Sequence, residues 1–237
     1  MHSVALGIAT AVTMFAATAV AQTRLVTEEM IVKSPDPGIA IYVRNKRPAD
    51  MTTFRPERTV LYVHGATYPA STAFDLQLSG MSWMDYIAAR GYDVYLLDLR
   101  GYGKSTRPKE MADDPQTNPP IVRGDTAVKD IGTVVDFILA RRNIPRLNLI
   151  GWSWGTVTMA TYTTQNPSKV ERLILYAPGW IRQTASLVQA GPGALGAYRK
   201  VTREQAMQRW IRASTLELER AVRWIAVVRH FAATLRR

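Results

Sequence analysis

An apolar run leads directly into Gly151-Trp152-Ser153-Trp154-Gly155, and this junction constrains the fold more than any other stretch of the chain. The run covers residues 147–150, and the five residues after it read Gly-x-Ser-x-Gly. A serine between a buried strand and a helix sits in a strained turn, where the flanking glycines avoid clashes because they have no Cβ. The free N–H groups of the following helix favour developing negative charge. The pattern predicts a strand–turn–helix unit that presents Ser153 as a nucleophile.

Two further apolar, β-branched runs end in short polar turns. Residues 59–63 lead into His64-Gly65-Ala66-Thr67, and residues 93–97 lead into a stretch from Asp98 to Ser105 that reads Asp-x-Arg-Gly-x-Gly-x-Ser. Runs that are apolar on both faces are typical of a parallel sheet covered by helices.

Other segments extend this alternation of strands and helices. Opening strands are expected at 25–33 and 39–44, with a polar connection from 46 to 56, and a further buried strand at 170–176. Loops are expected at 68–78 and 105–123. Helical periods predict helices at about 81–90, 124–142 and 154–165, and again at 203–212 and 216–235. The fold class that follows is α/β, a doubly wound and mainly parallel sheet with flanking helices.

On these three motifs, in this order, the chain resembles the α/β-hydrolase superfamily, in particular its serine esterases and lipases, over roughly residues 25–179. The resemblance implies that Ser153 is the nucleophile and that the backbone N–H groups of Ala66 and Trp154 form the oxyanion hole. His64 would be a structural residue that braces the oxyanion turn, and three glycines near the site would also be structural: Gly65, Gly151 and Gly155. Relatives that open epoxides or displace halide carry an aspartate at the elbow, so Ser153 favours esters, amides or other acyl compounds. The bulky Trp152 suggests a hydrophobic acyl pocket; the alternative is simple packing of the indoles of Trp152 and Trp154 against the cap.

The general base and its acid are not identified. The family order places both after the serine, yet no aspartate follows Asp136, and the only later histidine is His230. Because His230 falls in a segment with helical periodicity, we expect a place on the polar face of a surface helix rather than a catalytic role. The chain resembles the first two-thirds of the family, without the last two strands, and its Arg-rich end fits a truncated or out-of-frame product. The sequence predicts a serine hydrolase with weak or no activity; the alternative is a non-catalytic, hydrolase-like binding protein.

The first residues predict export. Residues 4–20 are almost wholly apolar, and Ala19-Val20-Ala21 matches the small-residue pattern of a signal-peptide cleavage site. An uncleaved anchor helix is the alternative. The expected organisation is a signal peptide at 1–21, an incomplete hydrolase core at 22–179, and a partial cap with a basic helical tail at 180–237.

Composition limits the possible partners. With no cysteine and only three histidines, none paired at ligand spacing, we predict no metal and no cofactor. From Arg199 onward ten Lys and Arg residues stand against three Glu, so the net charge of +11 belongs mostly to the tail and does not indicate a nucleic-acid partner. The expected partner is a small-molecule acyl substrate. Residues 216–235 form an amphipathic basic pattern, which suits either weak contact with a membrane surface or a helix that covers the core.

Overall fold

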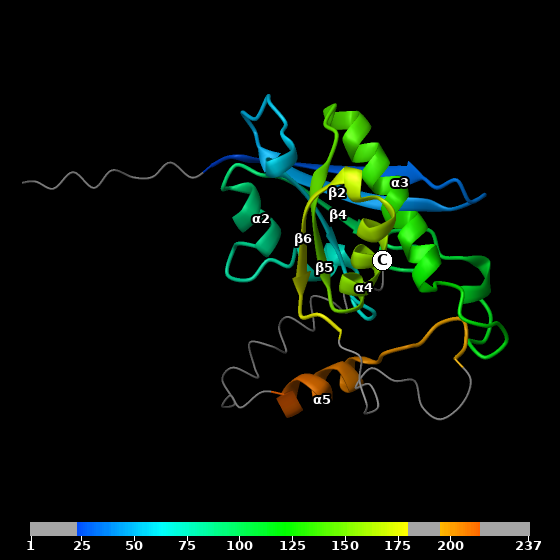
Figure 1. The fold of residues 1–237 in the computed structure, drawn as a ribbon. Helices are drawn as coiled ribbons and strands as arrows, with labels where there is room; N and C mark the ends of the chain where they lie inside the picture. The colour runs from blue at the N-terminus through cyan, green and yellow to red at the C-terminus, as the bar shows by residue number, and fades with distance from the viewer. Residues whose placement is uncertain (1–22, 180–194, 214–237) are drawn as a thin grey trace, which may run out of the picture.

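A six-stranded sheet forms the centre of the computed structural model, which describes residues 23–179 and 195–213 (Figure 1). Its strands are β1 (Leu25–Lys33), β2 (Ala40–Pro48), β3 (Thr59–Val63), β4 (Asp93–Asp98), β5 (Leu147–Trp152) and β6 (Val170–Tyr176). Their order across the sheet is β1-β2-β4-β3-β5-β6. The last four strands of this order run parallel, whereas β2 pairs antiparallel with both β1 and β4. The predicted α/β class with a mainly parallel sheet is confirmed.

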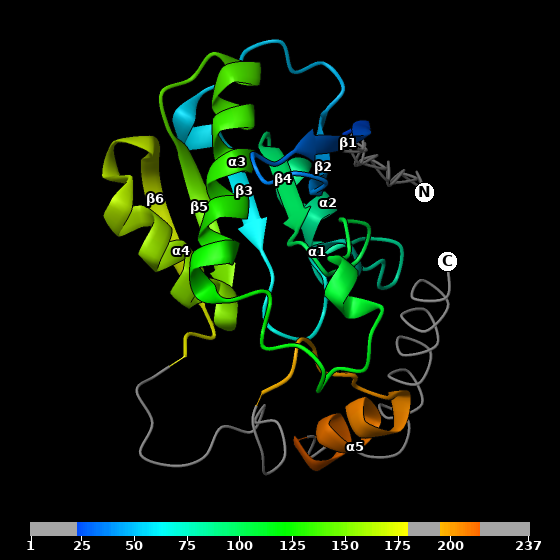
Figure 2. The same cartoon turned by 90° about the vertical axis from the view of Figure 1, so that its right-hand side faces the viewer.

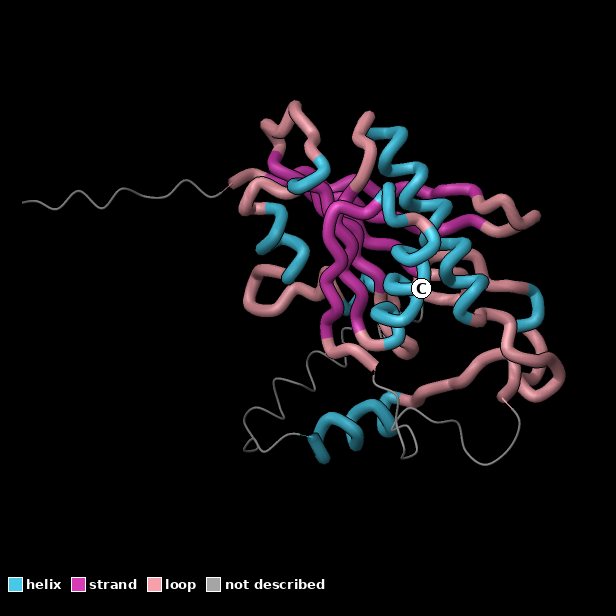
Figure 3. The backbone as a smooth tube through the Cα atoms, viewed as in Figure 1, coloured by secondary structure: helices cyan, strands magenta, loops and turns pink. Residues whose placement is uncertain are grey.

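Helices cover both faces of the sheet (Figure 2). The described helices are α1 (Ala70–Ala73), α2 (Trp83–Ala88), α3 (Gly124–Arg142), α4 (Trp154–Gln165) and α5 (Arg203–Ala213), with 3-10 turns η1 (Pro56–Arg58), η2 (Lys109–Met111) and η3 (Pro167–Lys169). Side chains of α3 and α4 share one apolar core with the sheet, and side chains of α1 and α2 share the other. By contrast, α5 lies apart from both layers, beneath the edge at which β5 and β6 end (Figure 3).

The central strands explain this layering. Every residue of β3 and β4 is buried, so neither strand has a face for water, and each face must be covered by a helix. Helix α3 is the longest of the described helices that pack on the sheet, and it buries Ile131, Val135 and Ile138 at helical spacing. It ends at Asn143, whose φ of 50° closes the helix in the left-handed region.

Several expected boundaries differ from the structure. Strand β2 continues to Pro48 instead of ending at 44, because its antiparallel pairing with β1 persists as far as Leu25. The expected helix at 81–90 is shorter, since α2 begins after Ser82, which forms a reciprocal capping box with Asp85. The expected loop at 68–78 contains α1, and the loop at 105–123 contains η2.

The prediction that residues 170–176 form a buried strand was wrong about burial. The strand exists, but Ile174 is 48% exposed and Tyr176 is 52% exposed. Within the described residues β6 is the last strand of the sheet and pairs only with β5. An edge strand lacks one of its two pairing partners, and the side chains that this partner would cover stay exposed. The edge position depends on the fold rather than on the apolar sequence of the strand.

Some predictions concern parts of the chain outside the described residues: the signal peptide at 1–21, most of the cap, the helix at 216–235 and His230. The described part after Gly179 contributes α5 and no strand. Within 23–179 and 195–213, no helix has the length and apolar character needed to cross a membrane.

Candidate active site

Ser153 occupies a strained turn between β5 and α4. Its φ is 53° and its ψ is −118°, a region that residues with a side chain rarely adopt and that costs about 1–3 kcal/mol. Such strain persists only where the surrounding contacts determine the backbone. The turn therefore marks Ser153 as a residue held in an unfavourable conformation by its neighbours.

Three glycines make this turn possible. A Cβ on Gly155 would lie 2.6 Å from the carbonyl oxygens of both Val63 and His64, and a Cβ on Gly151 would overlap the Gly155 carbonyl. A Cβ on Gly65 would lie 2.9 Å from the Ser153 Cβ. The elbow and the turn after β3 are thus in direct contact.

Backbone hydrogen bonds fix the strained residue from two sides. The Ser153 N–H donates to the Tyr176 carbonyl at the end of β6, at 3.0 Å. The Ser153 carbonyl accepts from the Thr156 N–H at 2.9 Å and from the Thr156 hydroxyl at 2.6 Å. The same hydroxyl accepts a bond from the Gly179 N–H at 3.4 Å. Sequence reasoning missed Thr156, although its place three residues after Ser153 was a usable signal.

His64 is fully buried and both of its ring nitrogens are engaged. Nε2 accepts from the Leu99 N–H at 3.0 Å, and Nδ1 lies 2.7 Å from the Gly65 carbonyl. A backbone N–H can only donate and a carbonyl can only accept, so we assign the neutral ring with its proton on Nδ1. Burial lowers the pKa of His64, which agrees with a neutral ring, although the nearby Asp98 acts in the opposite direction. In this arrangement His64 connects the ends of β3 and β4 and has no free lone pair for the Ser153 proton.

The stretch from Asp98 to Ser105 is a structural turn beneath the site. The Asp98 carboxylate accepts from the N–H and hydroxyl of Ser71 at 2.9 and 2.7 Å, and from the Lys104 N–H at 3.1 Å. Ser105 donates its hydroxyl to the Asp98 carbonyl and accepts from the Tyr42 N–H at 2.7 Å. These bonds use both carboxylate oxygens of Asp98, so its role here is to fix the loop rather than to serve Ser153.

Arg100, in the same stretch, forms a buried ion pair with Asp130 of α3. The guanidinium lies 2.5 Å from Asp130 Oδ1 and also binds Asp36 at 2.8 Å. Asp130 is wholly buried, and burial raises the pKa of its carboxyl while Arg100 opposes that shift. The pair joins the loop after β4 to α3 and to the β1–β2 turn.

The two expected oxyanion donors are reached differently: Trp154 follows Ser153 in the chain, and Ala66 comes from the turn after β3. Trp154 is the first residue of α4, and Ala66 follows the glycine that contacts the serine. Neither N–H donates to an acceptor among the described residues. Tyr102 donates its hydroxyl to the Ala66 carbonyl at 3.1 Å and packs its ring 4.6 Å from that of His64. Tyr102 thereby fixes the turn that carries Ala66, a contact that its place in the 98–105 motif could have suggested.

The rest of a catalytic triad is absent from the described part of the chain. No hydrogen bond joins the Ser153 hydroxyl to a histidine or a carboxylate there. Trp152 packs against the core beneath α2, and Trp154 packs against the core beneath α3. The two indoles therefore pack against the core on opposite faces of the sheet, and contact of either indole with most of the cap falls outside the described residues.

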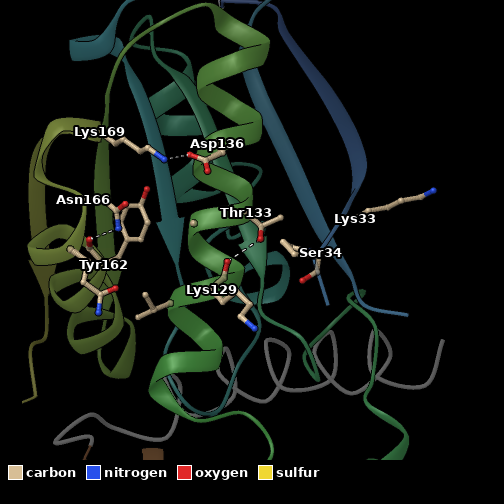
Figure 4. A pocket seen from close by; sticks show the side chains of 12 residues that line it. Lys33, Ser34, Lys129, Thr133, Asp136, Tyr162, Asn166 and Lys169 are labelled. Atoms are coloured by element: carbon tan, nitrogen blue, oxygen red, sulfur yellow. Dashed lines mark hydrogen bonds and ion pairs between the residues drawn. The ribbon is translucent and has the colours of Figure 1, made fainter. Parts of the chain in front are cut away.

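Away from the elbow, a concavity of about 660 Å³ lies between α3, α4 and the β1–β2 turn (Figure 4). An ion pair between Lys169 and Asp136 at 2.5 Å crosses one end, and Lys33 points away from it. Tyr162 lines it, but its hydroxyl is buried and has no partner among the described residues. No cluster of metal-binding side chains occurs in residues 23–179 or 195–213. The structure gives this concavity no convergent chemistry, and the candidate site remains the elbow.

Comparison with known proteins identifies the family. The sequence profile described as "alpha/beta hydrolase fold" matches residues 58–212, which include the turn after β3, the elbow and β6. The chain belongs to the α/β-hydrolase family.

Individual relatives match only in part. The chain is 33% identical over 85 residues to "Abhydrolase domain-containing protein abhd-5.2" of Caenorhabditis elegans, which is 36% of this chain and 17% of that protein. Among solved structures it is similar to the thioesterase domain from the curacin biosynthetic pathway, with a TM-score of 0.48, 20% identity, and 68% of this chain and 49% of that one covered. An epoxide hydrolase from Vigna radiata has a TM-score of 0.47 at 18% identity, covering 67% and 42%.

Proposed function

We propose that the protein is a serine hydrolase of the esterase type that acts on a small acyl substrate through Ser153. The observation that carries this proposal is the strained Ser153 backbone, with φ of 53°, at the strand–helix turn. In support of the proposal, the backbone N–H groups of Ala66 and Trp154, the expected oxyanion donors, donate to no acceptor among the described residues. A site that keeps such strain and leaves such donors open is suited to stabilise an oxyanion.

In this reaction the Ser153 oxygen bonds to the acyl carbon and the ester C–O bond breaks. The hydroxyl proton leaves with the alcohol, and water then releases the acid. The N–H groups of Ala66 and Trp154 would stabilise the negative oxygen of the intermediate. Because both nitrogens of His64 are engaged, no described group takes the proton, so we expect turnover far below that of a complete triad. Oxyanion stabilisation and binding alone retain roughly 10³–10⁴-fold over water.

Because no described group takes the Ser153 proton, we also consider a second candidate, a non-catalytic binding protein with the same fold. The two proposals differ in the reactivity of one hydroxyl. A neutral alkyl fluorophosphonate, which loses fluoride as the serine oxygen bonds to phosphorus, reports that reactivity without requiring turnover.

We expect covalent labelling of the wild type that Ser153→Ala abolishes and that the control Ser168→Ala retains. Ser168 is exposed and lies in η3, outside the turns that form the site. If folded wild-type protein is not labelled, the hydrolase proposal is rejected and the non-catalytic binding protein remains. If Ser153→Ala is still labelled, Ser153 is not the reactive group.

We also propose export by the signal peptide at 1–21, on the basis of the apolar run and the Ala19-Val20-Ala21 site. An exported protein without cysteine needs no oxidative folding. Contact of residues 216–235 with a membrane surface stays a proposal, motivated by the basic amphipathic sequence.

A further inference from the structure

Arg199 brings a positive charge to the turn that carries the expected oxyanion donor. Its Nη2 donates to the Thr67 hydroxyl at 3.2 Å, and Thr67 directly follows Ala66. Among the described residues no carboxylate forms an ion pair with Arg199. By contrast, the guanidinium groups of Arg100 and Arg142 each bind an aspartate. The charge of Arg199 is therefore not neutralised by this part of the protein.

The segment that carries Arg199 is attached to the loop at residues 105–123, between β4 and α3. The Ala197 N–H donates to the Pro115 carbonyl at 2.7 Å, and the Tyr198 hydroxyl donates to the Asp113 carbonyl at 2.9 Å. Gly196 lies so close to Pro115 that an added Cβ would overlap its carbonyl. The backbone just before Arg199 is therefore fixed to this loop, and the bond to Thr67 holds the guanidinium beside the turn after β3.

Its charge lies close enough to the serine to affect a bound ligand. Gly65 contacts Ser153, and Thr67 is two residues further along, at most roughly 7 Å in an extended chain. The Arg199 guanidinium lies 3.2 Å beyond the Thr67 hydroxyl, so its charge is on the order of 10 Å from the serine, a span that an extended acyl chain can bridge. The charge also acts on Tyr102, which follows β4 and donates to the Ala66 carbonyl: burial raises the pKa of the Tyr102 hydroxyl, and Arg199 opposes the rise.

A guanidinium in this position suits a carboxylate better than a neutral group. It has five N–H donors in a planar fork, of which the bond to Thr67 uses one. The remaining edge can bind both oxygens of a carboxylate. Since Arg199 is exposed, a ligand can reach it without first displacing protein.

We propose that Arg199 recognises a carboxylate on the acyl part of the substrate, so that the preferred substrates are half-esters of dicarboxylic acids. This proposal rests on the proposed function, because it names the substrate class of the same site. The ester carbonyl would lie at Ser153 and the distal carboxylate at Arg199.

The first experiment measures binding without chemistry, in Ser153→Ala. Tryptophan fluorescence, which Trp152 and Trp154 beside the site supply, is titrated with monomethyl hexanedioate and with its neutral dimethyl ester. We expect the monoanion to bind at least 5-fold more tightly. Adding Arg199→Gln should remove this preference, and Arg199→Lys should retain part of it.

Lys200→Gln is the matched control, because it removes the same charge one residue away. Lys200 is exposed, and its Nζ lies 5.9 Å from the centroid of the Tyr198 ring. We expect less than a 2-fold change in the preference. An equal loss of the preference for the monoanion in Lys200→Gln would show a general effect of net charge and would overturn the proposal. Equal binding of the two ligands to Ser153→Ala that retains Arg199 would overturn it as well.

A second experiment separates this proposal from the proposed function. Labelling rates are compared for two fluorophosphonates with the same leaving group, one alkyl and one with a terminal carboxylate. Arg199→Gln should slow the carboxylated probe 5- to 20-fold and the alkyl probe less than 2-fold. Equal slowing of both would reject recognition of the carboxylate. If neither probe labels Ser153 while the fluorescence preference holds, the proposed hydrolase function fails and the carboxylate site stands as a binding site.

Discussion

Replacing Gly155 with alanine tests the contact between the elbow and the turn after β3. The new methyl group would lie 2.6 Å from two backbone carbonyl oxygens, those of Val63 and His64. Ordinary contact begins at about 3.4 Å, so one side must move by about 0.8 Å. Backbone atoms of β3, which is buried along its whole length, cannot move as a flexible side chain would.

We expect Gly155→Ala to lower the free energy of unfolding by about 3 kcal/mol, at the upper end of the cost of overpacking. For a chain of this size that corresponds to a fall in Tm of roughly 6–12 °C. Labelling by the alkyl fluorophosphonate should fall as well, since a displacement of about 1 Å at a reacting group can cost about 10²-fold. Urea unfolding and labelling rates on the same preparation measure both effects.

Gly124→Ala is the control, because an added Cβ there meets no atom within 4 Å. Its free energy of unfolding should change by no more than about 0.5 kcal/mol. If Gly155→Ala unfolds at the wild-type urea concentration and labels at the wild-type rate, the elbow does not contact β3 as described, and the argument for a constrained Ser153 is refuted.

Further predictions concern other parts of the structure. Burial lowers the pKa of His64 below its ordinary 6.5, so the stability that the neutral ring contributes is present above that pH and is lost as the pH falls. Lowering the pH from about 7.5 to 5 should therefore reduce the free energy of unfolding of the wild type more than that of His64→Gln. An equal reduction in both proteins would contradict the assignment of a neutral His64. Asp130→Ala leaves the buried Arg100 without its main partner and should cost about 3 kcal/mol in urea unfolding, whereas a cost below about 1 kcal/mol would mean that the pair is not buried. Tyr162→Phe removes a buried hydroxyl with no described partner and should raise stability by about 1 kcal/mol, and a loss would reveal a partner. N-terminal sequencing of exported protein should begin at Gln22, and a start at residue 1 would refute cleavage.

Local patterns were sufficient for much of the fold. The bounds of β3, α3 and α4 agree with the sequence predictions because each is a buried apolar run or a helical period with clear ends. The extension of β2 and the exposure of β6 could not be found in this way. Both depend on which strand lies alongside, and the pairing partners are distant in the chain.

The candidate site shows the same division. The place of Ser153 between strand and helix follows from five adjacent residues. The bond from the Leu99 N–H to His64 Nε2 and the bond from Arg199 to Thr67 join segments that are 35 and 132 residues apart. The antiparallel placement of β1 and β2 was likewise not predicted, although it determines where the loop from Asp98 to Ser105 is attached.

The bond from the Ser153 N–H to the Tyr176 carbonyl has a mechanical consequence. The last residue of β6 holds the nucleophile directly, and the chain then continues through Gly179, whose N–H reaches Thr156. Tension on the segment that follows β6 would therefore be transmitted to the serine backbone within two hydrogen bonds. A single-residue deletion in β6 would shift this support by about 3.3 Å and relax the elbow without touching any group that reacts.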